Sequence, residues 1–202
     1  MNQSYFELPL EKQKNLINAG YKVFASYPYK KGSMSFIAEA AGISKSLLFY
    51  YFKNKKEYYL FLFDTAVASI NTRRKDSSSD EKIDLFLLVS HTVERRLRIM
   101  SEYPYLLQFV SRAYYENSEE ILTELEARKK GLMQLEKTEV LKLIDYDLFI
   151  KPSDAEVLVD IILCIAEGCM RGNEDLKPDK IRELLPAFQR MMESLKSYYY
   201  KH

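Results

Sequence analysis

Residues 33–55 of the chain read SMSFIAEAAGISKSLLFYYFKNK. Ser33 is placed to cap a short helix through Ala41, because a serine oxygen can accept a free backbone N–H of the first helical turn. Gly42 permits a sharp turn, and Ser44 can cap the next helix. This order of helix, tight turn and helix predicts a helix-turn-helix unit, whose second helix can enter the major groove of DNA.

The rest of the chain also favours helices over strands. Gly and Pro number only 6 each, and most segments place apolar residues at helical spacing. Pro28 should end the first helix, Ser153 with Glu156 should open a later one as a capping box, and Pro186 should kink or split the last. We therefore predict an all-α protein. The further helices are expected over about 10–26, 55–74, 80–101, 104–116, 118–145, 153–171 and 178–200.

Charge is divided unevenly along the sequence. Residues 1–75 hold 12 Lys and Arg against 5 Asp and Glu, whereas residues 76–202 hold 18 against 24. A basic N-terminal part suits a polyanionic partner, although a solvated basic surface without a partner would look the same.

The sequence shows neither a membrane span nor a signal peptide, so we expect a cytoplasmic protein without membrane partners. Cys164 and Cys169 lie about 140° apart on a helix, which favours packing thiols over a disulfide.

Helix geometry assigns roles within the quoted stretch. Lys45 and Ser46, at the start of the second helix, are placed to read base edges, and the residues that follow are placed to hold the DNA backbone. Leu48 and Phe52 lie one turn apart and are expected in the core. The candidate DNA-binding residues are Ser33, Ser44, Lys45, Ser46, Phe49, Tyr50, Tyr51, Lys53 and Lys55.

The same stretch resembles a known family at specific positions. Ile37-Ala38-x-x-Ala41-Gly42-Ile43-Ser44, followed by Leu48-Phe49-x-Tyr51-Phe52-x-x-Lys55, is similar to the DNA-binding segment of TetR-family regulators. Ala19 and Phe24 match the small and aromatic positions of the preceding helix, so the resemblance covers about 50 N-terminal residues. The family usually has Tyr at position 49 and a small residue such as Thr at position 47, where this chain has Phe and Leu.

The resemblance implies two domains and a homodimer. It implies a helix-turn-helix domain at 1–54, a connecting helix at 55–75 and a ligand-binding and dimerisation domain at 76–202. Aromatic and Met residues of the central helices are candidates for an apolar pocket, although ordinary packing suits them equally. These are Phe86, Met100, Tyr103, Phe109, Tyr114 and Met133. Candidates for the dimer interface are Val157, Leu158, Ile161, Ile165, Gly168, Leu184, Phe188, Met191, Met192 and Leu195.

Function follows from the motif and the resemblance together. We expect a sequence-specific regulator that binds a double-stranded DNA operator, a repressor released by a small, largely apolar effector. A DNA-binding regulator without small-molecule control, acting through a protein partner, remains an alternative. Catalysis is not expected, and neither is a cofactor or metal. The sequence holds only His91 and His202, and no Gly-rich phosphate loop or cluster of metal ligands.

Overall fold

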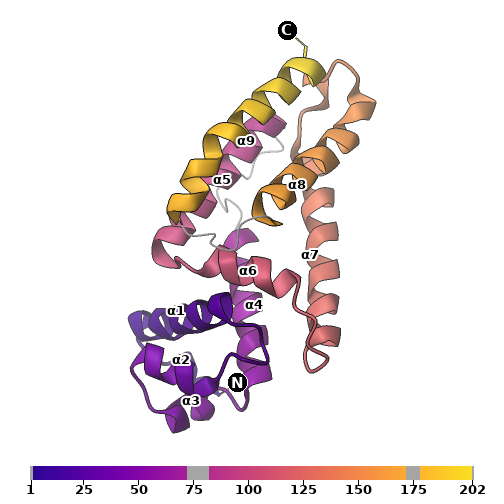
Figure 1. The fold of residues 1–202 in the computed structure, drawn as a ribbon. Coiled ribbons are helices and arrows are strands. Elements are labelled where there is room, and N and C mark those ends of the chain that lie inside the picture. The colour runs from indigo at the N-terminus through magenta and orange to yellow at the C-terminus, as the bar shows by residue number, and fades with distance from the viewer. Residues whose placement is uncertain (1, 72–81, 172–177, 202) are drawn as a thin grey trace. The chain divides into compact units, whose positions relative to one another are not determined.

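A computed structural model describes residues 2–71, 82–171 and 178–201 (Figure 1). Helices account for most of this part of the chain, and its only β pairing consists of two isolated bridges, which confirms the all-α prediction. The α-helices are α1 (Leu10–Ser26), α2 (Met34–Ala41), α3 (Lys45–Tyr51), α4 (Lys55–Asn71), α5 (Leu85–Glu102), α6 (Leu106–Tyr114), α7 (Leu122–Leu143), α8 (Ala155–Arg171) and α9 (Pro178–Tyr199). No helix in the described ranges is long and apolar enough to cross a membrane.

Helix ends largely follow the local signals in the sequence. α1 stops at Ser26, and Tyr27 before Pro28 is extended, as the ring of a following proline requires. Pro186 does not split α9, which runs unbroken past it. The proline is exposed, so water can reach the backbone of the turn that loses a hydrogen bond there. Ser153 lies inside a 3-10 turn, Pro152–Asp154, that directly precedes α8.

The chain forms two compact units. The first contains residues 1–71 and 99–129, and the second contains residues 72–98 and 130–202. α6 therefore belongs to the N-terminal unit, where it packs along α1, whereas the sequence placed it with the C-terminal helices. A helix whose apolar face fits α1 cannot be assigned to a domain from sequence order alone.

Buried aromatic residues dominate the core of the first unit. The Phe109 ring from α6 lies 5.1 Å from that of Tyr21 and 5.3 Å from that of Tyr59. The Phe24 ring lies 4.8 Å from that of Tyr59. Rings in tilted or edge-on contact at such distances add to the free energy gained by burying their area. These ring contacts hold α1, α4 and α6 together in the core of the first unit.

The C-terminal end of the chain completes the core of the second unit. Tyr200 pairs with Phe149 in one of the isolated bridges, and its hydroxyl accepts the backbone N–H of Leu85 at 3.1 Å. Leu158 and Met192 are buried in the same cluster. Cys164 is exposed and Cys169 partly exposed, so neither cysteine is fully packed inside as expected, and the two do not form a disulfide.

Gly20 allows α1 and α4 to approach closely. A Cβ atom at this position would lie 2.4 Å from both the Tyr58 hydroxyl and a Leu62 methyl group. Tyr58 is fully buried and donates its hydroxyl to the Leu16 carbonyl oxygen at 2.6 Å, so it cannot move away without losing that bond.

Gly20→Ala should therefore lower the free energy of unfolding by about 1–3 kcal/mol, the usual cost of overpacking a core. Chemical denaturation followed by circular dichroism measures the change. Gly168→Ala is the matched control, because among the described residues no atom outside its own helix backbone and its chain neighbours lies within 4 Å of the added Cβ. Equal stability of wild type and Gly20→Ala would contradict the tight crossing.

Candidate nucleic-acid interface

The turn between α2 and α3 has the geometry that the sequence predicts. Ser33 and Ser44 accept the backbone N–H groups of Phe36 and Leu47, each at 3.1 Å, so both helices begin with a serine cap. Gly42 has φ 67° and ψ 31°, a left-handed conformation in which a side chain would be strained. The described residues include no other positive φ.

One side of α3 packs into the core. Leu48 and Phe52 are completely buried, which confirms the prediction for both residues. The Phe52 ring lies 4.6 Å from that of Tyr58 and 5.1 Å from that of Tyr5. This packing fixes the rotation of α3 about its own axis, and so fixes which side chains point outward.

The other side of α3 is exposed along its length. Lys45 and Ser46 lie at its N-terminal end, and the Ser46 hydroxyl is 3.1 Å from that of Ser44. Leu47, Phe49 and Tyr50 are also exposed, at 37%, 38% and 56%. Lys53 is exposed just beyond the helix. Six of the nine candidate residues thus lie exposed on this face or directly beside it: Ser44, Lys45, Ser46, Phe49, Tyr50 and Lys53. Ser33, which caps α2, is only partly exposed.

Tyr51 does not share this exposure. Only 8% of its surface is accessible, and its ring lies 6.3 Å from that of the buried Tyr5. The sequence suggested a backbone contact because Tyr51 follows Tyr50 directly, but consecutive helix residues point about 100° apart. Tyr51 therefore serves mainly to pack α3 onto the N-terminal segment.

That N-terminal segment is a part of the site that sequence reasoning missed. The Asn2 N–H donates to the carbonyl oxygen of Tyr51 at 2.9 Å, and the Ser4 hydroxyl lies 3.2 Å from the hydroxyl of Tyr50. Tyr5 is 1% exposed and anchors the segment against Phe52. The segment supports the C-terminal end of α3. No local pattern could have shown this, since Ser4 and Tyr50 are 46 residues apart.

Lys55 is directed at the protein's own backbone. Its Nζ donates to the carbonyl oxygens of Tyr29 at 3.0 Å and Lys30 at 3.5 Å, and lies 4.2 Å from the centre of the Tyr29 ring. At the start of α4, Asn54 Oδ1 already accepts the N–H of Glu57 at 2.8 Å. The expected phosphate contact at this helix start is thus largely replaced by intramolecular bonds that hold the loop before α2.

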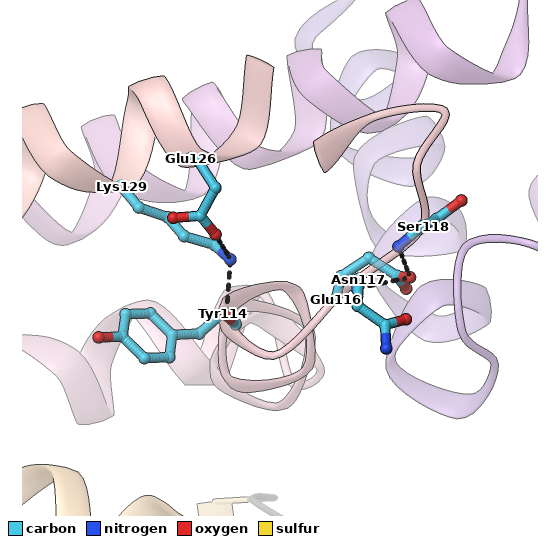
Figure 2. A network of polar contacts seen from close by, with 6 residues as sticks. All are labelled: Tyr114, Glu116, Asn117, Ser118, Glu126 and Lys129. Carbon is cyan, nitrogen blue, oxygen red and sulfur yellow. Dashed lines mark hydrogen bonds and ion pairs between the residues drawn. The ribbon is translucent and has the colours of Figure 1, made fainter. Parts of the chain in front are cut away.

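Tyr29 in that loop is held from a second direction by Glu116. The buried Glu116 carboxylate accepts the backbone N–H of Tyr29 at 2.8 Å. It also accepts the backbone N–H groups of Ser118 at 3.0 Å and Asn117 at 3.2 Å (Figure 2). The Tyr29 hydroxyl donates to Glu120 Oε1 at 2.8 Å. Burial, and then this hydrogen bond, raise the pKa of Tyr29 well above its usual value. Both oxygens of the Glu116 carboxylate therefore already have partners within the protein.

A second buried charge lies nearby. Lys129 donates to the Tyr114 carbonyl oxygen at 2.6 Å and to Glu126 Oε1 at 2.9 Å (Figure 2). Its side chain is 7% exposed, so it is paired within the protein and ties α7 to the end of α6.

The structure divides the described pocket candidates between the two units. Met100 and Phe109 are completely buried in the first unit, where Tyr103 packs on Tyr21, and Tyr114 is 36% exposed. Phe86 is buried in the other unit, with its ring 5.0 Å from that of Tyr200. The side chain of Met133 lies outside the described residues. Aromatic and Met side chains pack as readily as they line pockets, and here the described ones pack or reach the surface.

The candidate dimer residues divide between core and surface. Leu158 and Met192 are buried in the second unit, and Ile165, Phe188 and Leu195 pack partly against its core. Val157 and Met191 are 54% and 44% exposed, Gly168 is exposed, and Ile161 and Leu184 are partly so. An open groove of about 420 Å³ runs between α8 and α9. Its lining residues are Ile165, Ala187, Arg190, Met191, Ser194 and Leu195.

Replacement of Lys55 by Met should lower the free energy of unfolding by about 1–2 kcal/mol, because the loop carbonyls lose a charged donor that is only partly exposed. Lys53→Met removes the same charge from an exposed position and should change stability by less than about 0.5 kcal/mol. Urea denaturation of both variants measures the difference. If the two variants have equal stability, Lys55 does not hold the loop.

Known proteins share this helix-turn-helix segment. The family model described as "Bacterial regulatory proteins, tetR family" matches residues 16–60, which include α2 and α3. An uncharacterised HTH-type transcriptional regulator of Bacillus subtilis, YhgD, is 25% identical over 112 residues. That match covers 55% of this chain and 56% of the relative, so the chain matches little more than half of the relative's length.

Solved structures share the fold over nearly the whole chain. A TetR family transcriptional regulator from Chloroflexus aurantiacus is 18% identical with a TM-score of 0.57, and the match covers 100% of this chain and 99% of that one. MexZ of Pseudomonas aeruginosa is 17% identical with a TM-score of 0.63, over 96% and 100% of the two chains. These relatives are regulators rather than enzymes, in line with the expectation from the sequence. The helix-turn-helix part of the chain is thus similar to the tetR family of bacterial regulatory proteins, and the fold of the chain is similar to that of TetR family structures.

Proposed function

We propose that this protein is a sequence-specific DNA-binding transcriptional regulator, with α3 as its recognition helix. The observation that carries the proposal is the outward face of α3, which presents Lys45, Ser46 and Tyr50 while Leu48 and Phe52 fix its rotation from behind. A seven-residue helix held on a capped turn can enter the major groove with its N-terminal residues toward base edges.

Residue roles follow from position on this face. Lys45 and Ser46 supply hydrogen-bond donors at the N-terminal end of α3, where base edges are read. The Tyr50 hydroxyl, supported by Ser4, and Lys53 contact phosphates. The capping serines contribute further phosphate contacts, from the exposed Ser44 and the partly exposed Ser33. The excess of basic residues before position 76 strengthens attraction to DNA without specifying a sequence.

The protein acts as a homodimer in this proposal. Val157 on α8 and Met191 on α9 are exposed apolar residues, Met191 lines the groove between these helices, and a second copy would cover both residues. Two recognition helices about 34 Å apart would then bind a roughly palindromic operator in successive major grooves.

Repression is the direction we propose, because MexZ, which shares the fold, is described as a repressor. A small, largely apolar effector would release the operator by favouring a dimer with the wrong helix spacing, at a typical coupling free energy of about 1–3 kcal/mol. Since Met100 and Phe109 are completely buried in the packed core of the first unit, control by a protein partner is the competing possibility. A thermal-shift screen joined to an operator-release assay separates the two.

Lys45→Ala should change the preference among DNA sequences, whereas Lys53→Ala should weaken binding to all of them alike. Loss of a phosphate contact lowers the slope of log affinity against log salt by about 1, and loss of a base contact changes one position of the site. Fluorescence anisotropy over a salt series, with DNA from upstream of the protein's own gene, measures both. If neither substitution alters affinity or preference, α3 is not the recognition helix.

Met191→Lys should convert the dimer to a monomer. The Met191 side chain is 44% exposed in the isolated chain, so the substitution should lower the free energy of unfolding of the monomer only slightly. In the dimer, however, the new lysine would place a buried charge in the interface. Light scattering after size-exclusion chromatography measures the mass. Tyr115→Lys, at a similarly exposed apolar residue of the other unit, should stay dimeric. An unchanged mass for Met191→Lys would exclude this face as the interface.

A further inference from the structure

The outward face of α3 has few groups that can read a base through hydrogen bonds. Leu48 and Tyr51 are buried, which leaves five exposed residues in the helix. Of these, Lys45 and Ser46 carry donors at the end of α3 that approaches base edges. Leu47 and Phe49 offer only apolar surface, at 37% and 38% exposure.

Phe49 lies next to Lys45 on the same side of the helix. The two residues are four apart, about one turn, and the Lys45 Nζ is 6.0 Å from the centre of the Phe49 ring. When the ammonium group reaches one base pair, the ring therefore faces a neighbouring pair. Leu47 is about 160° from Phe49 around the axis and cannot contact the same base.

The major groove contains one apolar group that a phenyl ring can recognise, the 5-methyl group of thymine. Apart from small C–H groups, the other groups on the base edges there are hydrogen-bond donors or acceptors, which a ring without polar atoms cannot satisfy. We propose that Phe49 reads the methyl group of a thymine next to the base pair contacted by Lys45. This inference rests on the proposed DNA-binding function and adds to it a base-specific role for Phe49.

The packing of Phe49 supports a role at the surface. Its neighbours Leu48 and Phe52 complete the core beneath α3, and both are fully buried. Phe49 is not needed to close that core. The Lys45 ammonium group approaches the Phe49 ring only to 6.0 Å, near the outer limit for a cation and a ring, so the ring face stays available.

Uracil substitution in the operator tests the proposal, because deoxyuridine lacks only the methyl group of thymidine. Each thymine of the footprinted operator is replaced in turn, and the dissociation constant is measured for the wild type and for Phe49→Ala. At one thymine in each half-site, uracil should weaken wild-type binding by roughly three- to tenfold, the effect of losing one buried methyl contact. Phe49→Ala should bind both operators with equal affinity.

Leu47→Ala is the matched control, because it also removes an exposed apolar side chain from α3. It should keep the wild-type sensitivity to uracil at that thymine. Phe49→Leu should keep part of the sensitivity, since an apolar contact remains. Circular dichroism confirms that each variant is folded.

Three results would overturn the proposal. Wild-type binding that is insensitive to uracil at every position would show that no methyl group is read. A Phe49→Ala protein that keeps the full sensitivity would assign the methyl contact to another residue. In both cases DNA binding itself would stand. Absence of any sequence-specific binding by the wild type would instead overturn the proposed function, and this inference with it.

Discussion

The left-handed turn at Gly42 is the constraint on which the recognition surface depends. It reverses the chain between two short helices that are each capped by a serine, and so fixes the angle at which α3 leaves α2. With that angle set, Leu48 and Phe52 enter the core, and Lys45 and Ser46 face outward. A side chain at this position would strain the backbone by about 1–2 kcal/mol.

Contacts from distant parts of the chain hold this short unit in place. α3 has only seven residues, too few to be stable as a separate helix. Tyr5 supports it from the N-terminal segment. Lys55 and Glu116 hold the loop around Tyr29. Lys55 donates to the Tyr29 carbonyl oxygen, and Glu116 accepts the Tyr29 N–H. Because Glu116 follows α6, the helix-turn-helix is braced by residues far beyond the family's matched segment at 16–60.

The sequence predicted the parts of the site that depend on local chemistry. Serine caps, a turn glycine and apolar spacing act within a few residues, so α1, α2 and α3 and the burial of Leu48 and Phe52 could be predicted closely. Features that depend on distant partners were missed. Tyr51 is buried because Tyr5 lies against it, and Lys55 turns inward because carbonyl groups 25 and 26 residues earlier lie within its reach.

The central claim is that α3 reads operator DNA as one of a symmetric pair. Hydroxyl-radical footprinting of the full-length protein on DNA upstream of its own gene tests this most directly. The account predicts two protected half-sites related by two-fold symmetry, with centres one helical turn, or a whole number of turns, apart, where one turn is about 10–10.5 base pairs. A single protected half-site, or the absence of protection at protein concentrations that saturate the DNA, would contradict it.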